Sequence, residues 1–314
     1  MLLRPTTDAD LDRVLGCCSP GLAGSVAAGT YRAGLAYREY RPEWTWVAEE
    51  DGQILARAIW WGWSDAEHPM ALDGIDVRGS VAGRAGFAAR LLAAAHDAFR
   101  AAGTERLPEF DLSLPNDWRT DPAVVRSLGW RRRAASLAGL TDELERLRYA
   151  WTPAAGVPGR PGRLTLRAEP DDDVFLDALR RVAAGSLDVT TRRAIAARGA
   201  ERQARDDMQL YLDMPGDRAW WRLAYTRDGA LAGLAIPCRN ARVSTVGYLG
   251  VVPELRGRRY VDDILAEITR FHAAAGARRI GATTDVTNAA MAAAFERAGY
   301  RGHGIRLVLS APVS

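Results

Sequence analysis

A turn rich in arginine and glycine stands between two apolar segments within residues 248–268 and could bind a phosphate group. The apolar stretch YLGVV precedes it, and Ile264 and Leu265 begin an apolar helical face after it. A turn that opens a helix presents unpaired backbone N–H groups and the positive end of the helix dipole. Arg258 and Arg259 add charge-assisted donors. The segment predicts a pyrophosphate site, with a solvated basic turn as the alternative.

An internal duplication indicates which elements position this turn. Three segments occur twice, and their corresponding residues are Leu3 and Leu166, Asp51 and Asp228, and Trp130 and Tyr300. The first pair opens a strand, an acidic turn and an amphipathic run, and the second is an Asp-Gly turn that predicts a β-hairpin. A repeat of this kind predicts two domains of similar architecture.

A stretch dense in proline and glycine, residues 151–163, separates the two copies and is predicted to be a linker. The predicted domains are therefore residues 1–150 and residues 164–314. In the second copy the element order is strand, helices, hairpin, long strand, helix, strand, helix and strand. This order predicts a mixed α/β fold of the α+β type.

The phosphate-binding turn resembles the cofactor motif of the GNAT superfamily, L-x-V-x-P-x-x-(R/Q)-x-x-G-x-(G/A). Leu249, Val251, Pro253 and Arg256 match it in register, whereas arginine and valine stand where the last two small residues are expected. The resemblance implies two tandem GNAT folds, each a mostly antiparallel central sheet flanked by helices, in a layout similar to that of mycothiol synthase. It also implies acetyl-CoA, or another acyl-CoA, as co-substrate, without a metal.

The resemblance assigns cofactor contacts to one set of residues, namely Leu249, Val251, Arg256, Gly257, Arg258, Arg259, Tyr260, Val261, Asn288 and Phe295. Asn288 is expected to face the pantetheine arm, although asparagine is equally suited to cap a helix. Phe295 occupies the place of a tyrosine that protonates the leaving thiolate in the family. Phenylalanine cannot donate a proton, so that role is vacant or has moved.

The first copy is more degenerate. Gly86 and Ala88 are matched to the small residues of the motif, but Gly83 then replaces the arginine. We therefore predict that the second copy, residues 164–314, binds acyl-CoA. The first copy is then a structural partner or one wall of the substrate cleft.

The implied reaction is direct attack of an amine on the thioester in a ternary complex. A base must first make the amine neutral, and Asp285 and then Glu254 are the candidates, with turn formation as the alternative role of each. Tyr248 is a candidate proton donor to the thiolate, or else a packed aromatic residue. A backbone N–H near Val251 is expected to hold the oxyanion.

Composition excludes several other classes of protein. The formal net charge is +3 with 42 basic residues, all of them arginine, so no continuous track for nucleic acid is predicted. No apolar run reaches the roughly 18 residues of a membrane span. Cys17, Cys18 and Cys238 fit neither a disulfide framework nor a zinc site. We expect a cytoplasmic protein, monomeric or homodimeric, that meets neither membrane nor nucleic acid.

The function predicted from these features is N-acetyltransfer to an amine of a small molecule. Two alternatives remain. One is a catalytically degenerate protein that binds acyl-CoA or serves as a scaffold, which the missing tyrosine favours. The other is a protein N-acetyltransferase.

Overall fold

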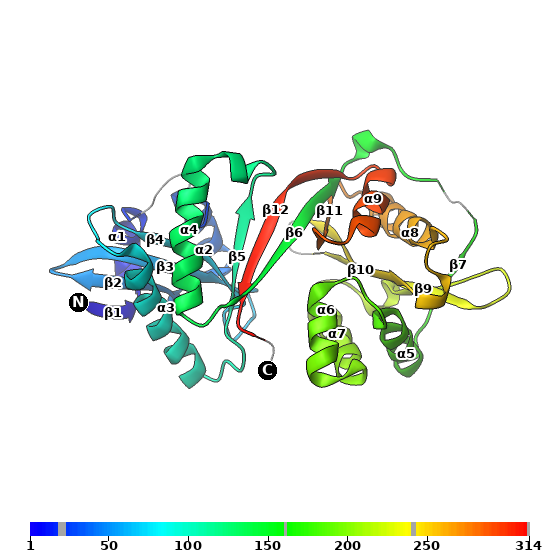
Figure 1. Ribbon diagram of the computed structural model, residues 1–314, viewed down its shortest axis with the longest axis horizontal. Helices are drawn as coiled ribbons and strands as arrows, with labels where there is room; N and C mark the ends of the chain where they lie inside the picture. Colours follow the sequence, from blue (N-terminus) through cyan, green and yellow to red (C-terminus); the bar gives the residue numbers. More distant parts are fainter. Residues whose placement is uncertain (18–22, 160–161, 240–242, 313–314) are drawn as a thin grey trace. The chain divides into compact units, whose positions relative to one another are not determined.

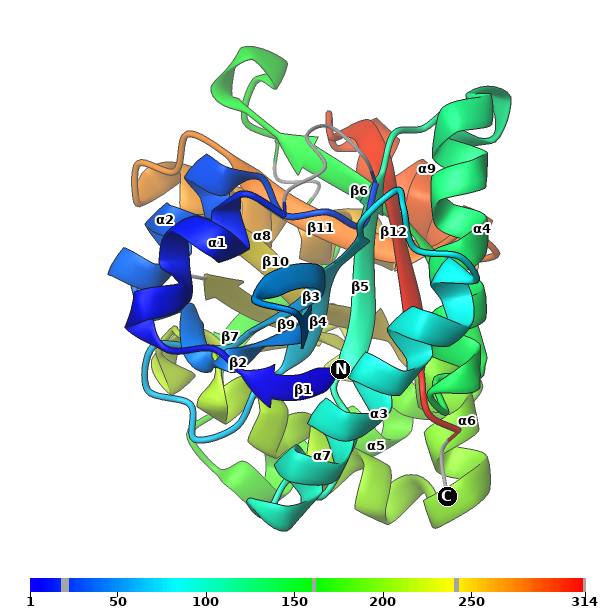
Figure 2. The same cartoon turned by 90° about the vertical axis from the view of Figure 1, so that its left-hand side faces the viewer.

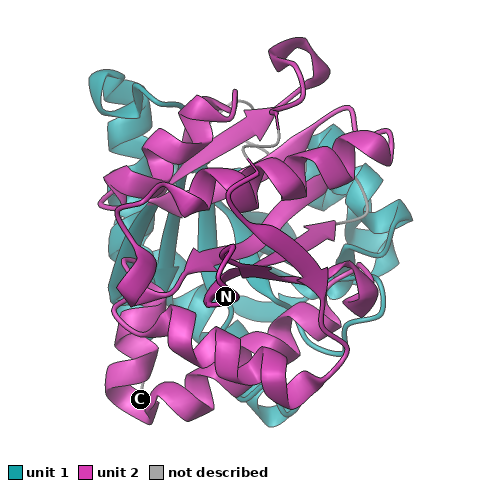
Figure 3. Cartoon of the chain, turned by 90° about the vertical axis from the view of Figure 1, so that its right-hand side faces the viewer, with its two compact units in different colours: residues 1–145, 305–312 teal, residues 146–304, 313–314 magenta. Residues whose placement is uncertain are grey.

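The computed structural model describes residues 1–17, 23–159, 162–239 and 243–312, and the chain divides into two compact units (Figures 1 and 3). Unit 1 comprises residues 1–145 and 305–312, and unit 2 comprises residues 146–304. Residues 160 and 161 of the predicted linker, and Cys18, lie outside the described residues. Among the helices described, none is long and apolar enough to cross a membrane.

Unit 1 contains a mostly antiparallel sheet in the strand order β1-β2-β3-β4-β5-β12, in which β4 and β5 are parallel. Its strands are β1 (Leu2–Pro5), β2 (Tyr40–Glu50), β3 (Gln53–Trp61), β4 (Ala71–Val77), β5 (Glu109–Leu114) and the second part of β12 (Arg301–Ser310). Its helices are α1 (Leu11–Leu15), α2 (Ala28–Ala36), α3 (Arg84–Ala101) and α4 (Pro122–Leu137), with 3-10 turns at Asp8–Asp10 and Trp118–Thr120.

Helices cover both faces of this sheet, with α1 and α2 on one side and α3 and α4 on the other (Figure 2). Successive strand residues point to opposite faces, so adjacent residues of β2 enter different cores. Val47 packs with the α1 and α2 residues, whereas the ring of Trp46 meets Phe99 of α3. The predicted hairpin turn at Asp51 and Gly52 is present between β2 and β3, and both residues have positive φ, as a two-residue turn requires.

Unit 2 repeats this arrangement in the strand order β6-β11-β10-β9-β8-β7, in which β10 and β11 are parallel. Its strands are β6 (Asp142–Trp151), β7 (Thr165–Ala168), β8 (Arg222–Tyr225), β9 (Leu231–Arg239), β10 (Ser244–Val251) and β11 (Ile280–Asp285). Its helices are α5 (Asp172–Ala183), α6 (Val189–Arg198), α7 (Ala200–Asp213), α8 (Tyr260–Ala274) and α9 (Ala289–Arg297), with 3-10 turns at Pro153–Ala155, Arg218–Trp220 and Pro253–Leu255.

Two apolar cores lie on opposite faces of the unit 2 sheet. Helices α8 and α9 cover one face, and α5, α6 and α7 lie on the other (Figure 1). On β9, Ala235 faces α8 and α9, whereas Leu234 and Ile236 face α5 and α7. The predicted mixed α/β fold, with mostly antiparallel sheets flanked by helices, is confirmed.

The division of the chain differs from the predicted one at two strands. Residues 305–312, predicted to end the second domain, belong to unit 1, where β12 pairs with β5 from Ile305↔Leu114 to Leu309↔Phe110. Residues 146–151 belong to unit 2, where β6 pairs with β11 from Arg146↔Asp285 to Trp151↔Ile280. Each sheet thus takes one strand from the opposite half of the sequence, which a local pattern of apolar residues does not encode.

Candidate functional site

Strands β10 and β11 diverge soon after they begin, and this opens the centre of the unit 2 sheet. Their recorded pairs are Ser244↔Ile280 and Thr245↔Gly281, both at the start of the two strands. Strand β10 continues to Val251 and β11 to Asp285. Backbone groups of an unpaired strand edge must find another partner. An extended ligand inserted between the strands can provide it.

Unit 1 has the same divergence between β4 and β5, but its own chain fills the opening. Recorded pairing ends at Leu72↔Phe110. Beyond it, the Ile75 N–H donates to the Gly24 carbonyl at 2.9 Å, and the Ile75 carbonyl accepts from Arg131 Nε at 2.9 Å. A Cβ at Gly24 would lie 2.6 Å from the Arg131 side chain, so glycine is required there. In the corresponding opening of unit 2 no main-chain bond like that of Ile75 to Gly24 is present among the described residues, and on β10 Arg256 bonds only to the Val251 carbonyl, at the end of the strand.

Arg256 holds the loop after β10 to the end of α5. Its Nε donates to the Val251 carbonyl at 3.0 Å, and its two terminal nitrogens donate to the carbonyls of Val182, Ala184 and Gly185. The side chain is therefore committed to main-chain oxygens. Arg256 thus positions the loop, and its direct contact with the cofactor stays a prediction.

Arg259, which stands where the GNAT motif has glycine, has a backbone conformation that favours glycine. It is the N-cap of α8 with φ 59° and ψ 24°, in the left-handed region. Gly257, two residues earlier, also has positive φ, at 79°. The loop thus enters the helix through a left-handed residue, and an L-residue in this region is unfavourable by about 1–2 kcal/mol.

Replacing Arg259 with glycine is expected to raise the free energy of unfolding by about 1 kcal/mol, because it relieves this conformational cost. Urea unfolding of the full chain measures the change. The matched control is Arg258→Gly, since Arg258 is exposed in the same loop without a positive φ, and it should lose stability. A loss of similar size in both variants would contradict the assigned strain.

Charges around the first turn of α8 are arranged in pairs, except at two arginines. Asp262 pairs with Arg297 at 2.6 Å, and Asp263 pairs with Arg163 of the preceding linker. The Arg163 side chain also donates to the carbonyls of Arg258 and Arg259. In the described part of the chain the exposed side chains of Arg258 and Arg259 make no hydrogen bond or ion pair, although Arg258 contributes to lowering the pKa of Asp228. They remain available to an anion at the helix N-terminus.

Asp285, the predicted base, is buried in a structural network at the end of β11. Its Oδ2 accepts from the Val189 N–H of α6 at 2.6 Å, and its Oδ1 lies 2.9 Å from Arg146 Nε. Arg146 also pairs with Asp188 at 2.5 Å. Burial raises the pKa of Asp285, but the residue is only 1% exposed and both oxygens face partners within the protein. Asp285 therefore anchors α6, because the strand ends against that helix, and its role as the base stays a prediction.

Tyr248 lies on β10 beside an aromatic and acidic group on α7. Its ring centroid is 5.8 Å from that of Tyr211. Burial raises the pKa of Tyr248 above its usual range, and the nearby charge of Asp207 adds to the effect. Burial also raises the pKa of Asp207 to about 6. The sequence analysis did not single out Asp207. The four-residue spacing of Asp207 and Tyr211 could have indicated that the two side chains lie on one face of a helix.

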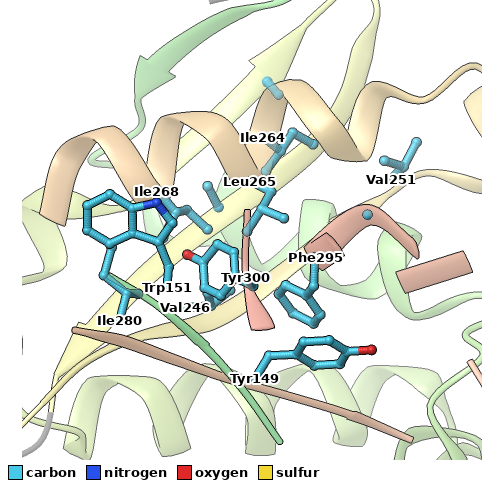
Figure 4. Packing of buried hydrophobic residues seen from close by; sticks show 13 residues of the cluster. Tyr149, Trp151, Val246, Val251, Ile264, Leu265, Ile268, Ile280, Phe295 and Tyr300 are labelled. Atoms are coloured by element: carbon cyan, nitrogen blue, oxygen red, sulfur yellow. The ribbon is translucent and has the colours of Figure 1, made fainter. Parts of the chain in front are cut away.

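The remaining predicted residues are divided between the opening and the core. Phe295 is 1% exposed and packs against Tyr149 and Tyr300 in the core under α8 and α9 (Figure 4). It is therefore a core residue, because α9 turns it toward the sheet. Asn288 caps α9 by accepting from the Met291 N–H at 3.2 Å.

Three cofactor candidates border the same core, whereas the cofactor candidate Gly257 and the candidate base Glu254 are exposed. Leu249, Tyr260 and Val261 pack at the margin of the core, and Val251 is buried in it. Glu254 is exposed on the 3-10 turn after β10, as is Gly257 in the loop. Val251 and Phe295 thus belong to one core, and Leu249, Tyr260 and Val261 pack against it.

The matching loop of unit 1 is shorter and enters its helix differently. It spans residues 78–83, against residues 252–259 in unit 2. Gly83 is the N-cap of α3 with φ 63°, so it corresponds to Arg259 rather than to Arg256. The predicted match of Gly86 and Ala88 to the small residues of the motif is wrong, because both lie inside α3. The shorter loop explains the difference in register.

Comparison with known proteins bears on the fold. No protein-family model and no curated protein matches the chain. Among solved structures, a GCN5-related N-acetyltransferase from Sphaerobacter thermophilus aligns with a TM-score of 0.56 at 15% identity, covering 98% of this chain and 94% of that chain.

Two further solved structures extend this comparison. The glucosamine N-acetyltransferase region of a fungal multi-domain β-N-acetylglucosaminidase aligns with a TM-score of 0.55 at 15% identity, covering 98% of this chain and 38% of that chain. A tandem GNAT protein from the clavulanic acid biosynthesis pathway has a TM-score of 0.49 at 16% identity and covers 100% and 99% of the two chains. The chain has the fold of the GCN5-related N-acetyltransferases.

Proposed function

We propose that this protein is an acyl-CoA-dependent N-acyltransferase that transfers an acetyl group, or a related acyl group, to an amine of a small molecule. The observation that carries the proposal is the divergence of β10 and β11. The opening between them leads into the loop of residues 252–259, here called the Arg258 loop, and to the N-terminus of α8. One edge of unit 2 thus combines an unpaired strand with an anion-binding helix end. An extended pantetheine arm joined to a pyrophosphate has matching chemistry.

The assignment to unit 2 is supported by the contrast with unit 1. There Gly24 and Arg131 already satisfy the backbone groups of Ile75 within the opening. In unit 2 the pantetheine arm would lie along Tyr248–Val251, with the diphosphate at Arg258 and Arg259. The amine would attack the thioester directly in a ternary complex, and a backbone N–H near Val251 would hold the oxyanion.

A protein that binds acyl-CoA without transferring the group is the second candidate. The buried Phe295 favours it, because this position offers no proton to the thiolate. Tyr248 is the donor that the transferase proposal requires in its place. Transfer to a protein amine is a further possibility within the same chemistry.

Calorimetric titration of the full chain with acetyl-CoA and with CoA tests the proposal. We expect one binding site per chain for each ligand, because only the opening of unit 2 lacks a covering segment among the described residues. Absence of binding overturns the proposal, and two sites per chain contradict the closed state of unit 1. Binding without release of CoA in the presence of amines would favour the second candidate.

A further inference from the structure

We propose that the acceptor of this transferase is a cationic amine held on the inner face of α7, where Asp207 binds the ammonium group and takes its proton. This inference rests on the proposed acyl-CoA-dependent transfer in unit 2. It adds the class of acceptor, its place in the fold and the residue that deprotonates it.

Three polar residues share the face of α7 that looks toward β10. Gln203, Asp207 and Tyr211 are spaced four residues apart, so they lie one above another on the helix. Gln203 Nε2 donates to Asp207 Oδ1 at 2.7 Å, and the Tyr211 ring lies beside that of Tyr248. Asp207 is therefore positioned next to the strand whose open edge would receive the thioester.

Among the described residues, the side-chain oxygen of Gln203 lacks a hydrogen-bond donor that a ligand could supply. The residue is only 6% exposed, and its Oε1 is buried without a hydrogen-bond partner in the described structure. Exchanging the amide atoms would turn the oxygen toward the Asp207 carboxylate, so the present orientation is the favourable one. A buried acceptor without a donor costs about 1–3 kcal/mol. The atom belongs to the amide that contacts Asp207, so a donor bound there can satisfy both groups.

A primary ammonium group would supply both the positive charge and the hydrogen-bond donors that Asp207 and Gln203 Oε1 lack in the described part of the chain. It brings three N–H donors, and a cation is also attracted to aromatic ring faces such as those of Tyr211 and Tyr248. No cation of the described residues pairs with Asp207, whereas the adjacent Asp206 pairs with Arg198 and Arg202. The site therefore favours a cationic amine over a neutral or anionic acceptor.

The surroundings of Asp207 raise the pKa of its carboxyl group. Burial has the largest effect, and the carboxylates of Asp188 and Asp206 add to it. The Gln203 hydrogen bond and the Arg198 cation act in the opposite direction, and the resulting pKa is about 6. Asp207 is thus mostly ionised at neutral pH, yet it accepts a proton more readily than an ordinary aspartate, as a general base should.

The proton balance of the transfer closes without another reactant. The Asp207 carboxylate takes one proton from R–NH₃⁺, and the neutral R–NH₂ attacks the thioester carbon. The C–N bond forms, the C–S bond breaks, and the second proton of the nitrogen passes through the Tyr248 hydroxyl to the leaving thiolate. The products are the amide and CoA–SH, and Asp207 then releases its proton to solvent.

The test compares Asp207→Asn with the matched control Asp213→Asn, at the exposed last residue of α7, where the carboxylate accepts from Gln209 Nε2 at 2.8 Å. The probe is n-butylammonium, with n-butanol as its neutral counterpart. Carbon-13 NMR of the side-chain carboxylates in the full chain follows their titration. We expect Asp207 to titrate near pH 6 and its pKa to fall by at least half a unit with n-butylammonium, but not with n-butanol.

Activity supplies the second measurement. With n-butylamine as acceptor, kcat/KM should fall about 100-fold or more in Asp207→Asn, the usual contribution of a general base, and less than twofold in Asp213→Asn. The acid limb of the pH profile, set by ionisation of Asp207 near pH 6, should vanish in Asp207→Asn alone. Acetyl-CoA affinity should be unchanged in both variants.

The outcomes separate this inference from the proposed function. If acetyl-CoA binds but the titration of Asp207 does not respond to n-butylammonium, the inference is wrong and the proposed function stands. If acetyl-CoA does not bind the unchanged chain, the proposed function fails. The NMR result decides the inference whether or not n-butylamine is turned over.

Discussion

A chain in which Arg258 and Arg259 are both replaced by glutamate is expected to bind acetyl-CoA at least about 100-fold more weakly. A hydrogen bond to a charged group contributes about 1.5–3 kcal/mol, and two such bonds lost correspond to a factor of about 100 or more. The new carboxylates would also repel the diphosphate at the N-terminus of α8. Calorimetric titration of the two chains measures the difference.

The matched control for this prediction is Arg84→Glu. Arg84 is the first residue of α3, at the corresponding helix entry of unit 1. Its reversal should change acetyl-CoA affinity less than twofold, because the opening beside it is filled by Gly24 and Arg131. A loss as large as that of the double variant would place the cofactor in unit 1 and contradict the proposed site.

The second large effect concerns the buried ion network of unit 1. Arg57, Asp76 and Arg131 are each no more than 1% exposed, and the Asp76 carboxylate lies 2.8 Å from Arg57 and 3.2 Å from Arg131. Replacing Asp76 with leucine leaves two buried guanidinium groups without a counter-charge. We expect a loss of about 3–5 kcal/mol in the free energy of unfolding, as for a broken buried ion pair.

Urea unfolding of the full chain measures this loss, and hydrogen exchange localises it to unit 1. The control is Asp111→Leu, which breaks the ion pair of Asp111 with Arg306 on neighbouring strands of the same unit. These side chains are 19% and 32% exposed, so the pair should contribute about 1 kcal/mol or less. Equal losses from the two variants would show that Asp76 does not compensate the buried arginines.

Local features of the fold could be predicted from the sequence, and features set by distant residues could not. The dipeptide Asp51–Gly52 is typical of a two-residue hairpin turn. In the structure the residues on either side of it, Glu50 and Gln53, are paired. The dipeptide Asp228–Gly229 has the same sequence but lies in a longer loop, which is closed by a hydrogen bond from the Thr226 N–H to the Ala230 carbonyl. Pairing partners further along the strands decide between these outcomes.

The candidate site shows the same limit. The Arg258 loop and the helix after it follow from adjacent residues, so they could be predicted. The role of Arg256 depends on carbonyls of α5 more than 70 positions away in the sequence, and the burial of Phe295 depends on the packing of α9. Asp207 was missed because its neighbour Tyr248 lies on a different element.

The pairing of β12 in unit 1 and of β6 in unit 2 has a consequence for folding during synthesis on the ribosome. Strand β5 pairs with residues 305–309, which are synthesised after nearly the whole of unit 2. An emerging N-terminal half therefore carries the exposed edge of β5 throughout that interval, and such an edge is a template for unwanted pairing. Although domains near the N-terminus generally fold first during synthesis, the sheet of unit 1 can be completed only after residues 305–309 have been made.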